Sequence, residues 1–162
     1  MSGHIDRNLI QNSALACFLI SKFVSRYEEL TAGTRSPELM KVLLILPILW
    51  HKNSCETVRK KKTTTAFRTV LVENPIIRSG IQDRIEAFAA TTLQGANLAC
   101  ASGLLKRIVV DDYPVLTTCF TRWPKGSNPA DAPTAMLQAI DRLAFWFKDF
   151  SAAELYSQIL KD

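Results

Sequence analysis

The sequence has few of the residues that build catalytic or metal centres. It contains two histidines, His4 and His51, and four cysteines, with no C-x-x-C pair among them. His51 and Cys55 stand at helical spacing, but a structural zinc site needs a complete tetrahedral set, and no second nitrogen or sulfur pair lies nearby. A glycine-rich phosphate loop is absent as well. We therefore predict no catalytic residue, no cofactor and no metal, and interpret His51 as an orienting or capping side chain at a helix end.

The chain also has no apolar run long enough to cross a membrane. The most apolar stretch, Val42–Lys52 (VLLILPILWHK), contains Pro47 and stops at His51, whereas a membrane helix requires about 20 apolar residues. We therefore expect this stretch to be buried in protein. The N-terminus shows no basic segment followed by an apolar core, and the unpaired cysteines favour a reducing compartment. The prediction is a cytoplasmic protein without a signal peptide or membrane contact.

Charged residues fall outside the apolar stripes. Glu28, Glu29, Asp111 and Asp112 occupy predicted helix ends or turns, where carboxylates stay solvated, so none is predicted to act in acid–base chemistry. The chain carries a net charge of +5. Its densest basic run is typical of a solvated face, yet it also offers cations for phosphate contact, and both interpretations stay open. The candidate nucleic-acid contacts are Arg59, Lys60, Lys61, Lys62 and Arg68.

The apolar spacing predicts a mainly α-helical protein that forms one domain. N-terminal helices are expected within residues 8–53, the first of them capped by Ser13. A second helix should kink or stop just before Pro47, which lacks the N–H that a helix interior needs. C-terminal helices are expected within residues 130–162, and Ser151 is predicted to cap the last one through a capping box.

The middle of the chain, residues 63–122, has the order of a winged helix-turn-helix. A helix over Ala66–Val72 is followed by an apolar stripe over Ile81–Ala89, and Thr91 or Thr92 is predicted to cap the next helix. Two strand-like runs on either side of Asp111–Asp112 then predict a small β-hairpin. The predicted fold is therefore a winged helix-turn-helix-like core with additional helices at both ends.

The charges of this region disfavour reading of a DNA groove. The predicted helix Thr92–Ser102 has no lysine or arginine, and the carboxylates of Asp111 and Asp112 at the hairpin tip would face phosphates. A winged helix that binds protein fits these charges better. The alternative is a winged-helix DNA-binding protein or transcriptional regulator that uses the basic run.

An ordered series of short motifs carries a family resemblance. The run L-P-I-L-W-H-K precedes a basic, threonine-rich connection, an N-P pair, an arginine-containing helix and a G-L-L that enters the hairpin. In this order the motifs, which extend approximately from Asn8 to Phe120, resemble the middle-component family of bacterial three-component ABC systems. The residues that carry the resemblance are Leu46, Pro47, His51, Lys52, Asn74, Pro75, Arg84, Gly103, Leu104 and Leu105.

The resemblance implies a non-enzymatic adaptor. Its partners would be an SMC-like ABC ATPase and a separate effector, usually a nuclease, as in Lamassu-type defence against phage and plasmids. The adaptor would restrain the effector until foreign DNA is sensed, and DNA would be contacted through the complex. The resemblance thus adds partners and a role to a sequence in which we find no catalytic group.

Overall fold

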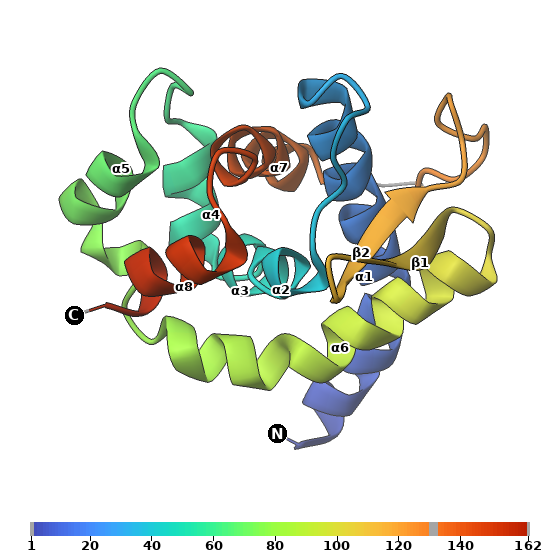
Figure 1. Ribbon diagram of the computed structural model, residues 1–162. Coiled ribbons are helices and arrows are strands. Elements are labelled where there is room, and N and C mark those ends of the chain that lie inside the picture. The colour runs from blue at the N-terminus through green and yellow to red at the C-terminus, as the bar shows by residue number, and fades with distance from the viewer. Residues whose placement is uncertain (1, 130–132, 162) are drawn as a thin grey trace.

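The computed structural model describes residues 2–129 and 133–161, with side chains from Ser13 onward. It confirms the prediction of a mainly helical fold with a small antiparallel hairpin (Figure 1). None of the described helices is long and apolar enough to span a membrane. In chain order the elements are α1 (Ser2–Leu30), α2 (Leu39–Val42), α3 (Ile45–Leu49), α4 (Lys52–Arg59), α5 (Phe67–Glu73), the 3-10 helix η1 (Pro75–Ile77), α6 (Ile81–Ala101), β1 (Leu105–Val110), β2 (Tyr113–Thr118), α7 (Thr134–Phe147) and α8 (Ala152–Leu160).

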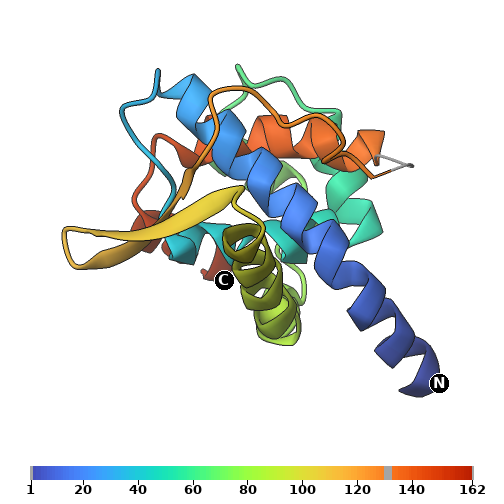
Figure 2. The same cartoon turned by 90° about the vertical axis from the view of Figure 1, so that its right-hand side faces the viewer.

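Helix α1 is the axis on which the larger elements pack. It runs diagonally across the molecule in Figure 2, with α7 packed above it and α6 crossing below it. The crossing with α6 is close because Gly95 faces Ala16, and a Cβ added at Gly95 would lie only 2.7 Å from the Cβ of Ala16. Packed side chains do not tolerate such an approach. The position therefore requires glycine, although it lies inside a helix.

The long apolar stretch is buried as predicted, but its helix breaks earlier than expected. Helix α2 ends at Val42 and α3 begins at Ile45, so the break lies before Leu46, and Pro47 is part of α3. Pro47 has no N–H to donate to the carbonyl of Leu43, four residues earlier, and its ring crowds that carbonyl. The helix is therefore interrupted where the hydrogen bond is lost rather than at the proline itself.

Two predicted helix starts are wrong for a common reason. The helices expected over Ile81–Ala89 and from Thr91 or Thr92 are one continuous helix, α6, with both threonines buried in its middle. Ser13 likewise lies inside α1, which begins at Ser2. Serine and threonine signal a helix start through a local side-chain bond. Here packing between α1 and α6 continues both helices through those residues.

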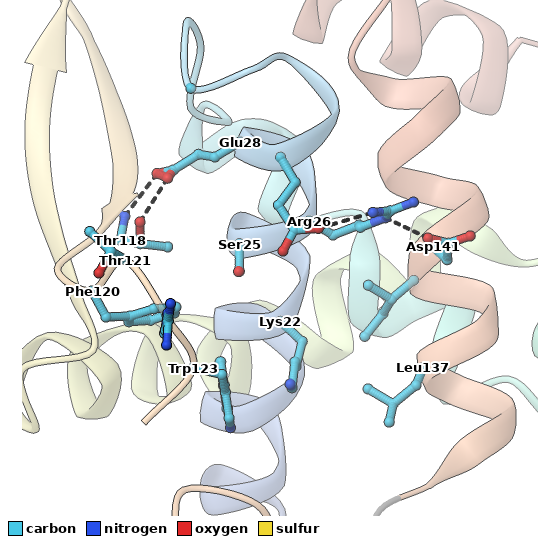
Figure 3. A pocket seen from close by; sticks show the side chains of 14 residues that line it. Lys22, Ser25, Arg26, Glu28, Thr118, Phe120, Thr121, Trp123, Leu137 and Asp141 are labelled. Carbon is cyan, nitrogen blue, oxygen red and sulfur yellow. Dashed lines mark hydrogen bonds and ion pairs between the residues drawn. The ribbon is translucent and has the colours of Figure 1, made fainter. Parts of the chain in front are cut away.

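One carboxylate holds the hairpin against α1. Glu28 accepts hydrogen bonds from the hydroxyls of Ser36 (3.1 Å), Thr117 (2.9 Å) and Thr118 (2.8 Å) and from the backbone N–H of Thr118 (2.9 Å). Figure 3 shows the Glu28 side chain reaching across to Thr118. Our interpretation of Glu28 as a solvated helix-end acid is therefore wrong, because its charge is shared among donors from two other segments.

A buried lysine joins α2 to the ends of two other helices. Lys41 is only 4% exposed, and its Nζ donates to the hydroxyl of Tyr27 (2.8 Å) and to the backbone oxygen of Phe147 (3.1 Å). Burial lowers the pKa of Lys41 and raises the pKa of Tyr27. A cation in this place satisfies the C-terminal end of α7, where backbone carbonyls lack helical partners.

Replacing Glu28 tests the carboxylate anchor. Glu28→Ala removes the acceptor of the Thr118 N–H and of three hydroxyls, and we expect the free energy of unfolding to fall by about 2 kcal/mol. The measurement is urea denaturation followed by circular dichroism. Glu29→Ala is the matched control, because Glu29 makes an exposed ion pair with Arg26 and should contribute less than about 1 kcal/mol. Equal losses in the two variants would contradict the anchor.

The lowered pKa of Lys41 predicts a pH dependence of stability. Because the unfolded chain holds the lysine proton more tightly than the folded protein, stability should rise with pH up to about 10.4, the ordinary pKa of lysine. Lys41→Met removes this contribution. We therefore expect the difference in unfolding free energy between wild type and Lys41→Met to move in favour of the wild type when pH is raised from about 7 to about 9.

The matched control for this titration is Lys60→Met, which removes an exposed lysine. The difference in unfolding free energy between wild type and Lys60→Met should stay nearly constant over the same pH range. If the Lys41→Met difference is equally flat, the Lys41 ammonium is hydrated in the folded protein and the buried position is incorrect.

Candidate interaction surfaces

Arg84, in the first turn of α6, joins three segments of the chain. Its guanidinium donates to the backbone oxygens of Pro47 (3.0 Å from Nε), Ile77 (2.9 Å from Nη2) and Ser79 (2.5 Å from Nη1). A planar fork with five donors can reach several carbonyls at once. Burial lowers the pKa of Arg84. The side chain therefore stabilises backbone that the broken α3 and the short η1 leave without helical partners.

Several motif residues of the sequence meet at this junction. Asn74 ends α5 by donating its side-chain amide to the backbone oxygen of Val70 (2.9 Å), and Pro75 opens η1, the segment that Arg84 holds. Pro47 supplies a second carbonyl to the same arginine. Leu46 is completely buried beside it in α3. Residues that are distant in the sequence thus build one corner between α3, η1 and α6.

His51 forms the turn between α3 and α4. Its Nδ1 lies 2.6 Å from the hydroxyl oxygen of Ser54, and burial together with the positive charge of Arg84 lowers its pKa. The predicted position at a helix end is observed, although the imidazole bonds a side chain and caps no backbone N–H. Cys55 is buried, Lys52 is exposed, and no group of three potential metal ligands exists among the described residues.

The G-L-L motif lies at the opposite end of α6. Gly103 adopts a φ of +79°, and Leu104 N–H donates to the carbonyl of Ala99 (2.9 Å), which ends the helix in a Schellman-type turn. Leu105 then begins β1. Helix α6 has 21 residues and is therefore about 30 Å long, so this turn lies far from the corner at Arg84. The motif residues form two structural groups rather than one site.

Part of the basic run is already engaged within the protein. Arg59 makes an ion pair with Glu56 (2.8 Å), and Lys60 approaches the same carboxylate at 3.7 Å. Lys62 and Arg68 are exposed and have no ion pair in the described part of the chain, and Lys61 is half-buried. In Figure 1 these residues lie around α4 and α5, at the other side of the molecule from the hairpin. The structure therefore separates the basic run from the predicted wing.

A hollow lies between α1, α7 and the segment that follows β2 (Figure 3). It has a volume of about 740 Å³. Trp123 packs edge-on against Phe18 and Phe120, and the Nζ of Lys22 lies 3.8 Å from the centre of a Trp123 ring. Burial lowers the pKa of Lys22. This cation–π contact was not predicted, because it joins residues about one hundred positions apart.

On the opposite side of this hollow, Arg26 bonds Asp141 of α7 at 2.5 Å and Glu29 at 2.9 Å. These pairs give the hollow a charged wall facing its aromatic wall (Figure 3). A second, more apolar groove of about 590 Å³ lies between α3, α4, α6 and the start of α7, where Trp50 packs edge-on against Phe88. The two hollows flank α1 and differ in polarity.

Comparison with known proteins identifies the family. The model of the family described as ABC-three component (ABC-3C) system Middle Component 3 matches residues 6–161. No curated protein and no solved structure matches the chain. The family match extends well past Phe120, where the predicted resemblance ended, and so includes α7 and α8. Because it spans nearly the whole sequence, the chain belongs to the Middle Component 3 family of ABC-three component systems.

Proposed function

We propose that the protein is a non-catalytic adaptor that joins an SMC-like ABC ATPase to a separate effector. The observation that carries the proposal is the family match over residues 6–161, since a middle component belongs to a system with further components. The engagement of His51 with Ser54, and the use of Arg84 and Glu28 for internal hydrogen bonds, support a structural role for these polar side chains.

In the proposed mechanism the adaptor holds a nuclease-type effector inactive until foreign DNA changes the state of the ATPase, as in Lamassu-type defence against phage and plasmids. Such a role needs separate faces for two partners. The hollow lined by Lys22 and Trp123 and the groove around Trp50 offer two surfaces of different polarity on one helical frame.

The adaptor proposal predicts a bridged complex. When the tagged protein is expressed together with its neighbouring genes, we expect an ABC ATPase with long coiled coils and an effector to co-purify with it. When the gene for this chain is deleted and the ATPase is tagged instead, the effector should no longer be recovered. Recovery of ATPase and effector together without this chain would show that it does not bridge them.

A second candidate function is DNA binding through the basic run. The exposure of Lys62 and Arg68 favours this function. The acidic tip of the hairpin opposes it, as does the position of the basic run at the other side of the molecule from the hairpin, which is the predicted wing. In the adaptor proposal these cations contact DNA only weakly and within the complex. A regulator would instead bind DNA alone, with sequence preference.

Salt-dependent binding separates these alternatives. We expect the isolated protein to bind duplex DNA weakly and without sequence preference in an anisotropy titration, and more tightly with the ATPase present. Lys62→Ala with Arg68→Ala should lower the salt slope by about 2, whereas Arg59→Ala with Lys60→Ala, which removes cations already paired with Glu56, should change it less. Tight, sequence-specific binding by the isolated chain would support the regulator.

A further inference from the structure

The β-hairpin projects from the helical body (Figure 2). It exposes apolar side chains. In β1 only Leu105 is buried, whereas Val109 is 69% exposed and Val110 is 46% exposed. Tyr113, which begins β2 opposite Val110, is 57% exposed. An exposed apolar strand at a sheet edge is a template for pairing with another strand. The hairpin is therefore the most conspicuous uncovered apolar feature among the described residues.

The outer edge of β2 is closed by the protein itself. Leu116 N–H donates to the backbone oxygen of Pro37 (3.1 Å), and Thr118 N–H donates to the carboxylate of Glu28 (2.9 Å). Pro114 is the next residue of β2 whose backbone groups face outward, and it has no N–H. Each outward position of β2 is thus either bonded or unable to donate.

The outer edge of β1 is open. Opposite residues of an antiparallel pair point together either toward the partner strand or away from it. Since Leu116 and Pro114 point away from β1, their partners Arg107 and Val109 also direct their backbone groups outward. Within residues 2–129 and 133–161, no strand or bridge pairs with this edge. The asymmetry between the two edges leaves β1 available for a further strand.

The charges along β1 and the turn are self-complementary. From Lys106 to Asp112 the sequence reads two cations, three apolar residues and two carboxylates (KRIVVDD). β1 ends at Val110, and Asp111 and Asp112 form the turn at positive φ. When β1 is placed antiparallel to a copy of itself and centred on Val109, the residues Ile108–Val110 of the two copies meet, and the acidic turn of each copy lies beside Lys106 and Arg107 of the other. We propose that β1 pairs with β1 of a second copy of this chain across a two-fold axis, which gives a four-stranded sheet.

The proposed register uses only the projecting part of the hairpin. The turn at Asp111–Asp112 lies beside Lys106 and Arg107, near the start of the second copy's β1, so each tip stops short of the partner's helical body. Val109 lies on the axis, and its outward N–H and C=O bond those of the partner's Val109. Few residues take part compared with a standard interface, so the dimer is expected to be weak and to form reversibly.

A disulfide placed on the axis tests the pairing directly. Val109→Cys, in a Cys119→Ser background that removes the exposed native thiol, should form a disulfide-linked dimer under mild oxidation. Opposite Cα atoms in a hydrogen-bonded antiparallel pair lie about 5.5 Å apart, within reach of a disulfide. Val72→Cys in the same background is the matched control, because Val72 is also 69% exposed but lies in α5. Equal cross-linking of both variants, or none at Val109→Cys, overturns the proposal.

Charge exchange tests the antiparallel arrangement. In analytical ultracentrifugation we expect Lys106→Glu and Asp112→Lys each to weaken self-association at least ten-fold, because each brings like charges together at both ends of the paired strands. An equimolar mixture of the two variants should associate again, since each variant charge then meets an opposite one. Circular dichroism checks that Asp112→Lys, at a φ of +67°, retains the hairpin. Failure of the mixture to associate overturns the proposal. The proposal is also overturned if the chain stays monomeric and the edge of β1 binds the ATPase or the effector instead.

Discussion

The carboxylate of Glu28 fixes the relation between the helical body and the hairpin. It lies near the end of α1 and collects donors from β2 and from the segment that leads to α2. One of its oxygens accepts the N–H of Thr118 at the outer edge of β2. The contact that anchors the hairpin therefore also closes the edge of β2 and leaves the edge of β1 open. A charged acceptor is well suited to this place, since hydrogen bonds to carboxylates are stronger than those to neutral oxygens. The exposure of β1 is therefore a consequence of how α1 holds β2.

Two basic side chains bond backbone carbonyls where helices break or end. Where Pro47 interrupts the apolar stretch and η1 ends after one turn, Arg84 donates to the carbonyls of Pro47 and Ile77, and Lys41 donates to the last carbonyl of α7. Buried carbonyls without partners are costly, so irregular backbone in a core needs donors of long reach. Two residues of the resemblance, Pro47 and Arg84, thus have a physical connection, since Arg84 bonds the carbonyl of Pro47 in the short helix α3.

The sequence predicted those features that depend on neighbouring residues. Ser151 accepts from Glu154 N–H at 3.1 Å, as the capping box indicates, and the hairpin turns at Asp111–Asp112, both at positive φ. The continuity of α6 was missed because it depends on packing against α1, where Gly95 meets Ala16 across about eighty residues. The anchor at Glu28 was missed for the same reason. Sequence distance, rather than weak local signals, limited the prediction of the surfaces.

The charges flanking the apolar part of β1 also restrict how an open edge can pair. Parallel pairing in register would place Lys106 beside Lys106 and Asp112 beside Asp112, which is unfavourable at both ends. A shift of one residue in the antiparallel arrangement would set the outward backbone groups of Val109 against a residue of the other copy whose own groups already face β2. Natural proteins commonly use edge charges to prevent association. Here the opposite signs at the two ends favour the antiparallel arrangement. The open edge is therefore specific for one kind of partner strand and does not pair with any exposed strand.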